Sequence, residues 1–168
     1  MAGNRRNDPG DSALSRGVIR GVIRTASNYR TTVHTEQIRI QTGSQERVHD
    51  ITEQCRAFLD RVEAGDGLLH AWVPHATAGL AVIETGSGSD TDLLAALREL
   101  LPMDDRWHHR HGSPGHGRDH LLPALLPPYA TVPVLDGRLA LGTWQSICLV
   151  DTNADNPRRT VRMSFLPG

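Results

Sequence analysis

The chain has 168 residues, enough for one domain of ordinary size with a buried core. Its formal net charge of −1 offers no electrostatic attraction for nucleic acid or an anionic membrane, and no run approaches the roughly 20 apolar residues that span a bilayer. All 18 basic residues are arginine, which excludes Schiff-base, pyridoxal-phosphate and P-loop chemistry because each needs a lysine.

The N-terminal 30 residues differ in composition from the rest of the chain. They carry six arginines against two aspartates and contain the short duplication RGVIRGVIR. Such a segment can be an organellar transit peptide, but a disordered or flexible Arg-rich tail is the preferred interpretation. We therefore predict a tail over residues 1–30 and one folded domain over residues 31–168.

The first half of that domain is predicted to contain three strands and two helices. Alternating residues predict a strand over 32–42, and two further strands are predicted over 67–75 and 79–85. Apolar residues at helical spacing predict a helix that begins after Asp50 and stops at Gly65, which makes Cys55 a core residue. A second helix is predicted from Ser89, its capping residue, to Leu101.

The second half is predicted to be a loop followed by strands. The histidine-rich tract 107–120 is expected as a loop, and strands are expected over 130–135, 138–152 and 158–166. A hairpin signal at Asp136-Gly137 and a turn at 153–157 separate these strands. Together the elements predict an α+β fold, a single compact domain with a largely antiparallel β-sheet or sandwich and two to three helices. No GxGxxG follows a strand, so a Rossmann domain is not expected.

The cysteines and histidines define the candidate chemistry. Cys55 and Cys148 are far apart and form no CxxC pair, so we expect neither a disulfide framework nor a thiolate zinc site. This use of cysteine predicts a cytoplasmic location. Five of the nine histidines lie between Trp107 and His120, and imidazole both binds metals and titrates near neutral pH. Because HExxH is absent, a solvated histidine-rich loop is the alternative.

A second candidate segment is HATAGLAVIE, in which His75 and Glu84 lie at opposite ends. The small residues from Ala76 to Gly79 allow a ligand or another backbone to approach closely. These two side chains are a pair of metal ligands, an acid/base pair, or parts of an ordinary hydrogen-bonded turn.

Three stretches together resemble one known family. HATAGLAVIE, the histidine before LLPALL, and VPVLDGRLALGTWQSICLVD resemble the YjbQ-type family, small proteins labelled secondary thiamine-phosphate synthase enzymes. The resemblance covers about residues 32–166. It implies a compact α+β fold, a homotrimer and a metal-associated histidine site.

The resemblance also implies roles for particular residues. His75, His109 and His120 match family histidines and would bind a divalent metal, which leaves His108, His111 and His116 as loop residues. Histidine ligands suit zinc or another transition metal, whereas magnesium, although possible, prefers oxygen. The remaining matched positions, taken as candidate catalytic residues, are Thr77, Glu84, Gln145 and Arg159.

Each of these matches carries an expectation. Thr77 replaces the family's serine and keeps a hydroxyl, and Glu84 would be a fourth ligand, an orienting carboxylate or a general base. Gln145 is expected to reach a ligand from a strand in which Trp144 belongs to the core. Departures from the family pattern include Asp119, which stands where a small residue is usual.

The most specific expectation is a transferase that couples hydroxymethylpyrimidine diphosphate to a thiazole phosphate with loss of diphosphate. A divalent cation and an arginine, with Arg110, Arg118 and Arg159 available, would stabilise the charge on the departing diphosphate. The alternatives are a metal-dependent hydrolase or phosphotransferase acting on a small phosphorylated metabolite, and a non-enzymatic trimeric metal- or metabolite-binding protein. The expected partners are thus a small phosphorylated metabolite and further copies of the chain, with no nucleic acid and no membrane.

Overall fold

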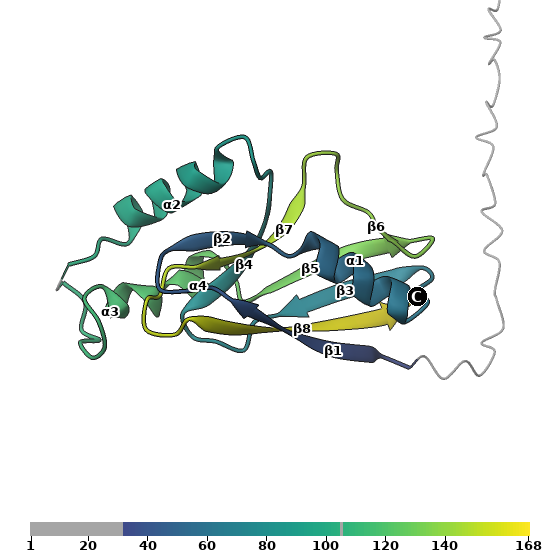
Figure 1. The fold of residues 1–168 in the computed structure, drawn as a ribbon, viewed down its shortest axis with the longest axis horizontal. Helices are drawn as coiled ribbons and strands as arrows, with labels where there is room; N and C mark the ends of the chain where they lie inside the picture. Colours follow the sequence, from purple (N-terminus) through teal and green to yellow (C-terminus); the bar gives the residue numbers. More distant parts are fainter. Residues whose placement is uncertain (1–31, 105) are drawn as a thin grey trace, which may run out of the picture. The chain divides into compact units, whose positions relative to one another are not determined.

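Two antiparallel sheets form the framework of the protein, for which a computed structural model describes residues 32–104 and 106–168 (Figure 1). The larger sheet has five strands, in spatial order β1 (His34–Gln41), β8 (Arg158–Pro167), β3 (Gly67–Trp72), β5 (Tyr129–Leu135) and β6 (Arg138–Leu139). The smaller sheet has the order β2 (Arg47–Asp50), β7 (Ser146–Asp151) and β4 (Ala78–Ile83). The predicted tail over residues 1–30 lies outside the described residues.

Four helical segments complete the described part of the chain. Their bounds are α1 (Thr52–Arg61), α2 (Ser89–Leu100), α3 (His116–Asp119) and α4 (Leu122–Leu125). The first two are full helices of 10 and 12 residues, whereas α3 and α4 have four residues each. The predicted α+β fold with antiparallel sheets is therefore confirmed. Within the described residues, no helix is long and apolar enough to cross a membrane.

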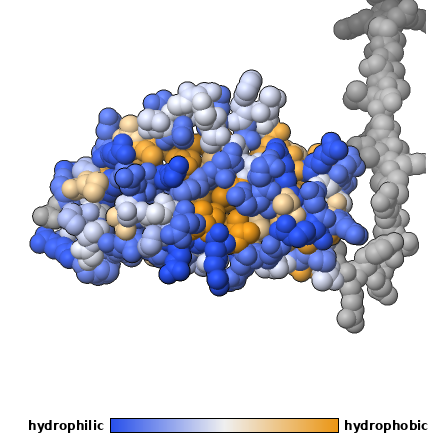
Figure 2. Space-filling view, in the orientation of Figure 1, coloured by the Kyte–Doolittle hydropathy of each residue, from blue (hydrophilic) through white to orange (hydrophobic). Residues whose placement is uncertain are grey.

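The main core lies between the inner faces of the two sheets and α1. Strand β8 alternates buried and more exposed residues, and its inward side chains Val161, Met163 and Phe165 pack in one cluster with Leu149 of β7 and Phe58 of α1. Cys55 belongs to the same cluster and is fully buried, as predicted. Figure 2 shows apolar surface near the middle of one face of this body, surrounded by hydrophilic residues.

A second core lies on the opposite side of β7. There Val150 packs in one cluster with Leu97 of α2, with Leu101 directly after α2, and with Leu122 of α4. Because β7 is covered on both faces, its sequence is a continuous apolar run rather than an alternating one. This arrangement places the segment between α2 and α4, which contains the histidine tract, at one end of the smaller sheet (Figure 1).

Three local predictions differ from the structure. The left-handed residue after α1 is Glu63, with φ of 49°, rather than Gly65. Gly88, with φ of 103°, precedes α2, so Ser89 is its first residue and makes no capping hydrogen bond. Asp50 does accept a hydrogen bond from the backbone N–H of Thr52 at 2.8 Å, although it lies one residue before the structural cap position of α1.

The largest difference concerns the predicted strand over residues 138–152. It is broken after Leu139, and the GTWQ segment forms a turn before β7 begins at Ser146. Gln145 closes this turn, since its Oε1 accepts the N–H of Gly142 at 2.8 Å. Trp144, expected in the core, is 72% exposed, because a turn residue has no sheet neighbour to cover it.

Gly79 provides a test of how tightly β4 packs against the residue after α4. A Cβ atom at this position would collide with the carbonyl oxygen and Cβ of Leu126. We expect Gly79→Ala to lower the free energy of unfolding by about 1–3 kcal/mol in urea denaturation, because backbone cannot move aside cheaply. The control is Gly65→Ala, whose Cβ would meet no atom within 4 Å and should change stability by less than about 0.5 kcal/mol. Equal stabilities of the two variants would contradict this packing.

Candidate metal centre

Three histidines converge at α3. His116 is the first residue of α3 and His120 follows its last, so the two are four residues apart and project from the same side of a helical turn. Their Nε2 atoms lie 3.0 Å apart. His109 comes from the preceding loop, with its ring centroid 4.2 Å from that of His120. One ligand atom from each of the three lies within 4.8 Å of those of the others.

Glycines make this convergence possible. Gly115 has φ of 85° and precedes α3, a conformation that L side chains rarely adopt. A Cβ atom on Gly117 would collide with the carbonyl oxygen of His109, and one on Gly112 would approach the His116 ring to 2.6 Å. The glycines of HGSPGHG therefore allow two chain segments to approach closely enough for their imidazoles to meet.

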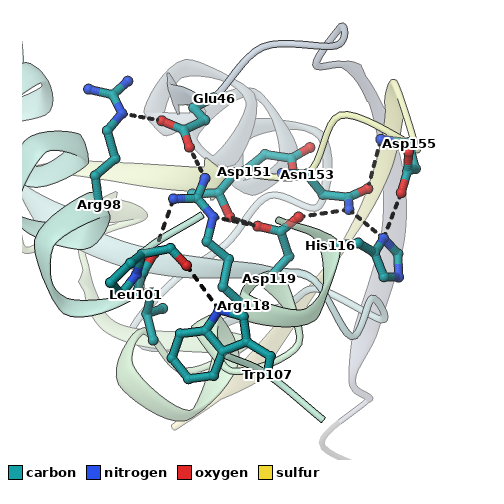
Figure 3. Close-up of polar contacts among 12 residues, drawn as sticks. Glu46, Arg98, Leu101, Trp107, His116, Arg118, Asp119, Asp151, Asn153 and Asp155 are labelled. Carbon is teal, nitrogen blue, oxygen red and sulfur yellow. Dashed lines mark hydrogen bonds and ion pairs between the residues drawn. The ribbon is translucent and has the colours of Figure 1, made fainter. Parts of the chain in front are cut away.

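A buried carboxylate fixes α3 to the turn between β7 and β8. Asp119 is 3% exposed and accepts hydrogen bonds from Thr152 Oγ1 at 2.7 Å and Asn153 Nδ2 at 2.9 Å. Its neighbour Arg118, also buried, forms an ion pair with Glu46 and donates to the Leu101 carbonyl at the end of α2. Figure 3 shows a continuous chain of contacts from Arg118 through Asp119 and Asn153 to His116 and on to Asp155.

His116 contacts a carboxylate on its other ring nitrogen. Its Nδ1 lies 2.6 Å from Asp155 Oδ2, which also accepts the backbone N–H of Ser113 at 3.1 Å. The hydrogen bond from Ser113, followed by that from His116, lowers the pKa of Asp155 against a smaller cost of burial, so the carboxylate stays ionised. The side chain that binds His116 is therefore an anion at neutral pH.

Two members of the cluster, His109 and His120, have lowered pKa values. Desolvation lowers the pKa of His120, and possible positive charges on His109, His116 and His111 lower it further, against a smaller opposing effect of Asp119. The pKa of His109 is lowered by desolvation and by His111 and His116. Neutral imidazole is the form that binds metal, and the lowered pKa values of His109 and His120 favour this form.

An open cleft of about 480 Å³ lies beside the cluster. His109 and His116 form part of its wall, together with His111 and the exposed Arg110. Arg110 donates from Nε to the carbonyl oxygen of Trp107 at 3.3 Å, which attaches it to the wall of the cleft. The cleft thus offers imidazole nitrogens, one guanidinium and glycine-rich backbone to a small ligand.

The structure brings together only part of the predicted ligand set. His109 and His120 are in the cluster, but the third member is His116, which we expected to be an ordinary loop residue. His75 is instead engaged with β8, where its Nε2 accepts the backbone N–H of Thr160 at 2.9 Å. Burial, followed by the charge of Arg159, lowers the pKa of His75, against a smaller raising effect of Asp151.

The predicted catalytic residues lie elsewhere. Arg159 is 2% exposed and forms a bidentate ion pair with Asp151, at 2.7 and 2.8 Å. Thr77 is buried in the turn before β4. Glu84 and Gln145 line a different cavity, of about 220 Å³, which they share with Asp50 and Trp144. The structure therefore places Glu84 and Gln145 together but apart from the histidine cluster.

Sequence reasoning missed the residues that support the cluster. Asn153 and Asp155 lie in the NADN turn, 37 and 39 residues after His116. Asp119 entered the sequence analysis only as a departure from the family pattern. A charged residue where the family has a small one could have indicated a new buried contact, and it is the one such indication in the sequence. Nothing in the spacing of Asn153 or Asp155 relates them to a histidine.

Sequence comparison and fold comparison both relate this chain to proteins of one kind. A family model described as UPF0047 protein YjbQ-like matches residues 36–168. The chain is 60% identical to the UPF0047 protein Rv2556c of Mycobacterium tuberculosis over 122 residues, which is 73% of this chain and 90% of that protein. It is 31% identical to the UPF0047 protein YugU of Bacillus subtilis over 125 residues, 72% of this chain and 89% of the relative.

Two solved structures share the same architecture. A YbjQ-like protein of unknown function from Sulfolobus solfataricus P2 superposes with a TM-score of 0.77 at 26% identity, covering 82% of this chain and 99% of the other. A hypothetical protein from Aeropyrum pernix K1 superposes with a TM-score of 0.73 at 32% identity, covering 80% and 99%.

The lowered pKa of His120 predicts an acid sensitivity that can be measured. Because the folded state binds this proton less tightly than the unfolded state, whose imidazole pKa is about 6.5, the unfolded state gains relative stability as the pH falls below that value. We expect the melting temperature to drop between pH 7.5 and pH 5.5, and to drop less in His120→Gln. A His120 titration midpoint at or above 6.5, measured by NMR, would contradict the prediction.

Proposed function

The chain belongs to the UPF0047 family of YjbQ-like proteins, and on this premise we propose that it is a metal-dependent enzyme that acts on a small phosphorylated compound. The observation that carries the proposal is the convergence of His109, His116 and His120 beside an open cleft. Three imidazoles leave coordination positions free, as a catalytic metal site requires.

The chemistry of the donors decides which metal fits. All three donors are imidazole nitrogens, which suit zinc and related transition metals, whereas magnesium prefers oxygen ligands. The neighbouring carboxylates of Asp119 and Asp155 are already occupied by hydrogen bonds from protein groups. We therefore propose a zinc-type ion held by the three histidines, with His75 outside the ligand set.

The remaining groups of the cleft fit a phosphorylated substrate. When bound, a zinc-type ion supplies Lewis-acid stabilisation of negative charge on a substrate or leaving group. Arg110, on the same cleft, provides a guanidinium that matches the geometry of phosphate oxygens. Its part would be to bind and orient the phosphate, while the glycine-rich backbone lets the substrate lie close to the histidines.

Two reactions are compatible with such a cleft. In the synthase reaction implied by the resemblance, the C–O bond of hydroxymethylpyrimidine diphosphate breaks, the thiazole nitrogen bonds to the same carbon, and diphosphate leaves. In the hydrolase alternative, water replaces the alcohol of a phosphate ester. Both place negative charge on a departing group or phosphoryl centre near Arg110, so the products rather than the site distinguish them.

A homotrimer is also part of the proposal. The outer face of the five-stranded sheet carries the aromatic side chains of His70, Trp72 and Tyr129, whose ring centroids lie 6.0–6.5 Å apart, next to the exposed Leu68. Exposed apolar residues that gather on one face are typical of protein contact surfaces. This face supports association of identical chains, which sedimentation analysis of the purified protein would measure.

Metal content tests the proposed site directly. We expect the chelator-treated protein, reloaded with Zn²⁺ and dialysed, to retain about one equivalent by elemental analysis, since three imidazoles converge. The triple variant His109→Ala, His116→Ala, His120→Ala should retain none while keeping its circular dichroism spectrum. His75→Ala is the matched control and should bind metal like the parent. A folded parent that takes up no metal, or a triple variant that still does, would overturn the site.

The loaded protein then distinguishes the reactions. Release of diphosphate in the presence of both thiamine precursors would support the synthase, and release of phosphate from a single ester would support the hydrolase. Loaded protein that turns over neither would overturn the enzymatic proposal in favour of a metal-binding protein without catalysis.

A further inference from the structure

We propose that Asp155 is a positioning residue of this metal centre, which holds His116 in the tautomer whose Nε2 lone pair faces the ion. The inference rests on the proposed function, because it assigns a role to a residue outside the ligand set. It extends the site to the turn between β7 and β8, from which none of the three ligands comes.

The hydrogen bonds determine where the proton of His116 lies. An ionised carboxylate can only accept hydrogen bonds, so at 2.6 Å from Asp155 Oδ2 the Nδ1 atom of His116 must carry the proton. The form of imidazole that binds a metal is neutral and has one N–H, so with this proton on Nδ1 the Nε2 atom has a free lone pair. Without Asp155, either ring nitrogen could carry the proton, and part of the population would present N–H instead of a lone pair.

The free nitrogen points toward the other ligands. His116 Nε2 lies 3.0 Å from His120 Nε2, and the ring centroid of His109 lies 5.5 Å from that of His116. Zinc–nitrogen bonds of about 2.0–2.1 Å in a tetrahedral site place two ligand nitrogens about 3.3 Å apart. The nitrogen that Asp155 leaves unprotonated is thus the one that lies at ligand distance from its neighbour.

Asp155 is itself held in place by a buried side chain. Asn153 Oδ1 accepts the backbone N–H groups of Asp155 and Asn156 at 3.2 and 3.1 Å, which shapes the turn. Asn153 Nδ2 donates to Asp119 Oδ2 at 2.9 Å, so the same amide also fixes α3. Its 3.2 Å approach to His116 Nδ1 does not supply a proton to that atom, because the Nδ1 proton already points to Asp155 (Figure 3).

Zinc competition with a chromophoric chelator measures the expected effect. Loss of the carboxylate partner of a ligating histidine typically weakens metal binding by 10–100-fold, and we expect a loss in this range for Asp155→Asn. Asp155→Glu, which keeps the charge, should recover part of the affinity. The matched control is Asp104→Asn, since Asp104 lines the same cleft but pairs with Arg106, and its affinity should equal that of the parent.

A second readout requires no metal. In the metal-free parent, the ¹⁵N chemical shifts of the His116 ring should show the proton on Nδ1, and in Asp155→Asn they should show a mixture of tautomers. A Cobalt(II) absorption spectrum that changes in Asp155→Asn but not in Asp104→Asn would support positioning, since a general loss of stability would not alter the coordination of the bound ion.

The outcomes separate the inference from the proposed function. If the parent binds zinc and Asp155→Asn binds it equally well with the same tautomer, the inference is wrong and the metal centre stands. If the parent binds no zinc, the metal centre itself is wrong, and the role of Asp155 as its positioning residue falls with it.

Discussion

The hydrogen bonds of the Asp119 carboxylate are the contacts on which the geometry of the histidine cluster depends. A helix of four residues has too few internal hydrogen bonds to be stable alone, so α3 must be fixed by tertiary contacts. Asp119 provides them by binding Thr152 and Asn153, while Arg118 binds Glu46 and the end of α2. Leaving either charge buried without its partners would be costly, and this cost favours one position of α3.

Patterns with a short period were predictable from the sequence, because they reflect which face of an element is buried. The alternation over residues 32–42 predicted β1, and the helical spacing around Cys55 identified the buried face of α1 correctly. The break after Leu139 was not predictable in this way, since the following residues remain apolar up to Trp144. What ends the strand there is a local hydrogen bond from Gly142 to Gln145, and hydropathy carries no signal for it.

The candidate site was predictable only in part for a different reason. The density of histidines between Trp107 and His120 indicated the right segment, but not which imidazoles face one another. His116 enters the cluster through contacts with a turn 39 residues away, and His75 is turned toward the N–H of Thr160. Both outcomes depend on sheet register and loop packing, which spacing along one chain does not contain.

The histidine cluster contributes little to folding stability, which agrees with the proposed role in binding a ligand. Its imidazoles repel one another when protonated and are partly desolvated, so their proximity gains little for folding. With the His116 proton on Nδ1, as we propose, the 3.0 Å contact would be a hydrogen bond from His120 Nε2–H to His116 Nε2. In the proposed centre, an ion between these two atoms would require His120 to carry its proton on Nδ1 instead of Nε2. The 3.0 Å separation of the two nitrogens is already close to the spacing that the proposed centre requires, which would lower the cost of assembling it.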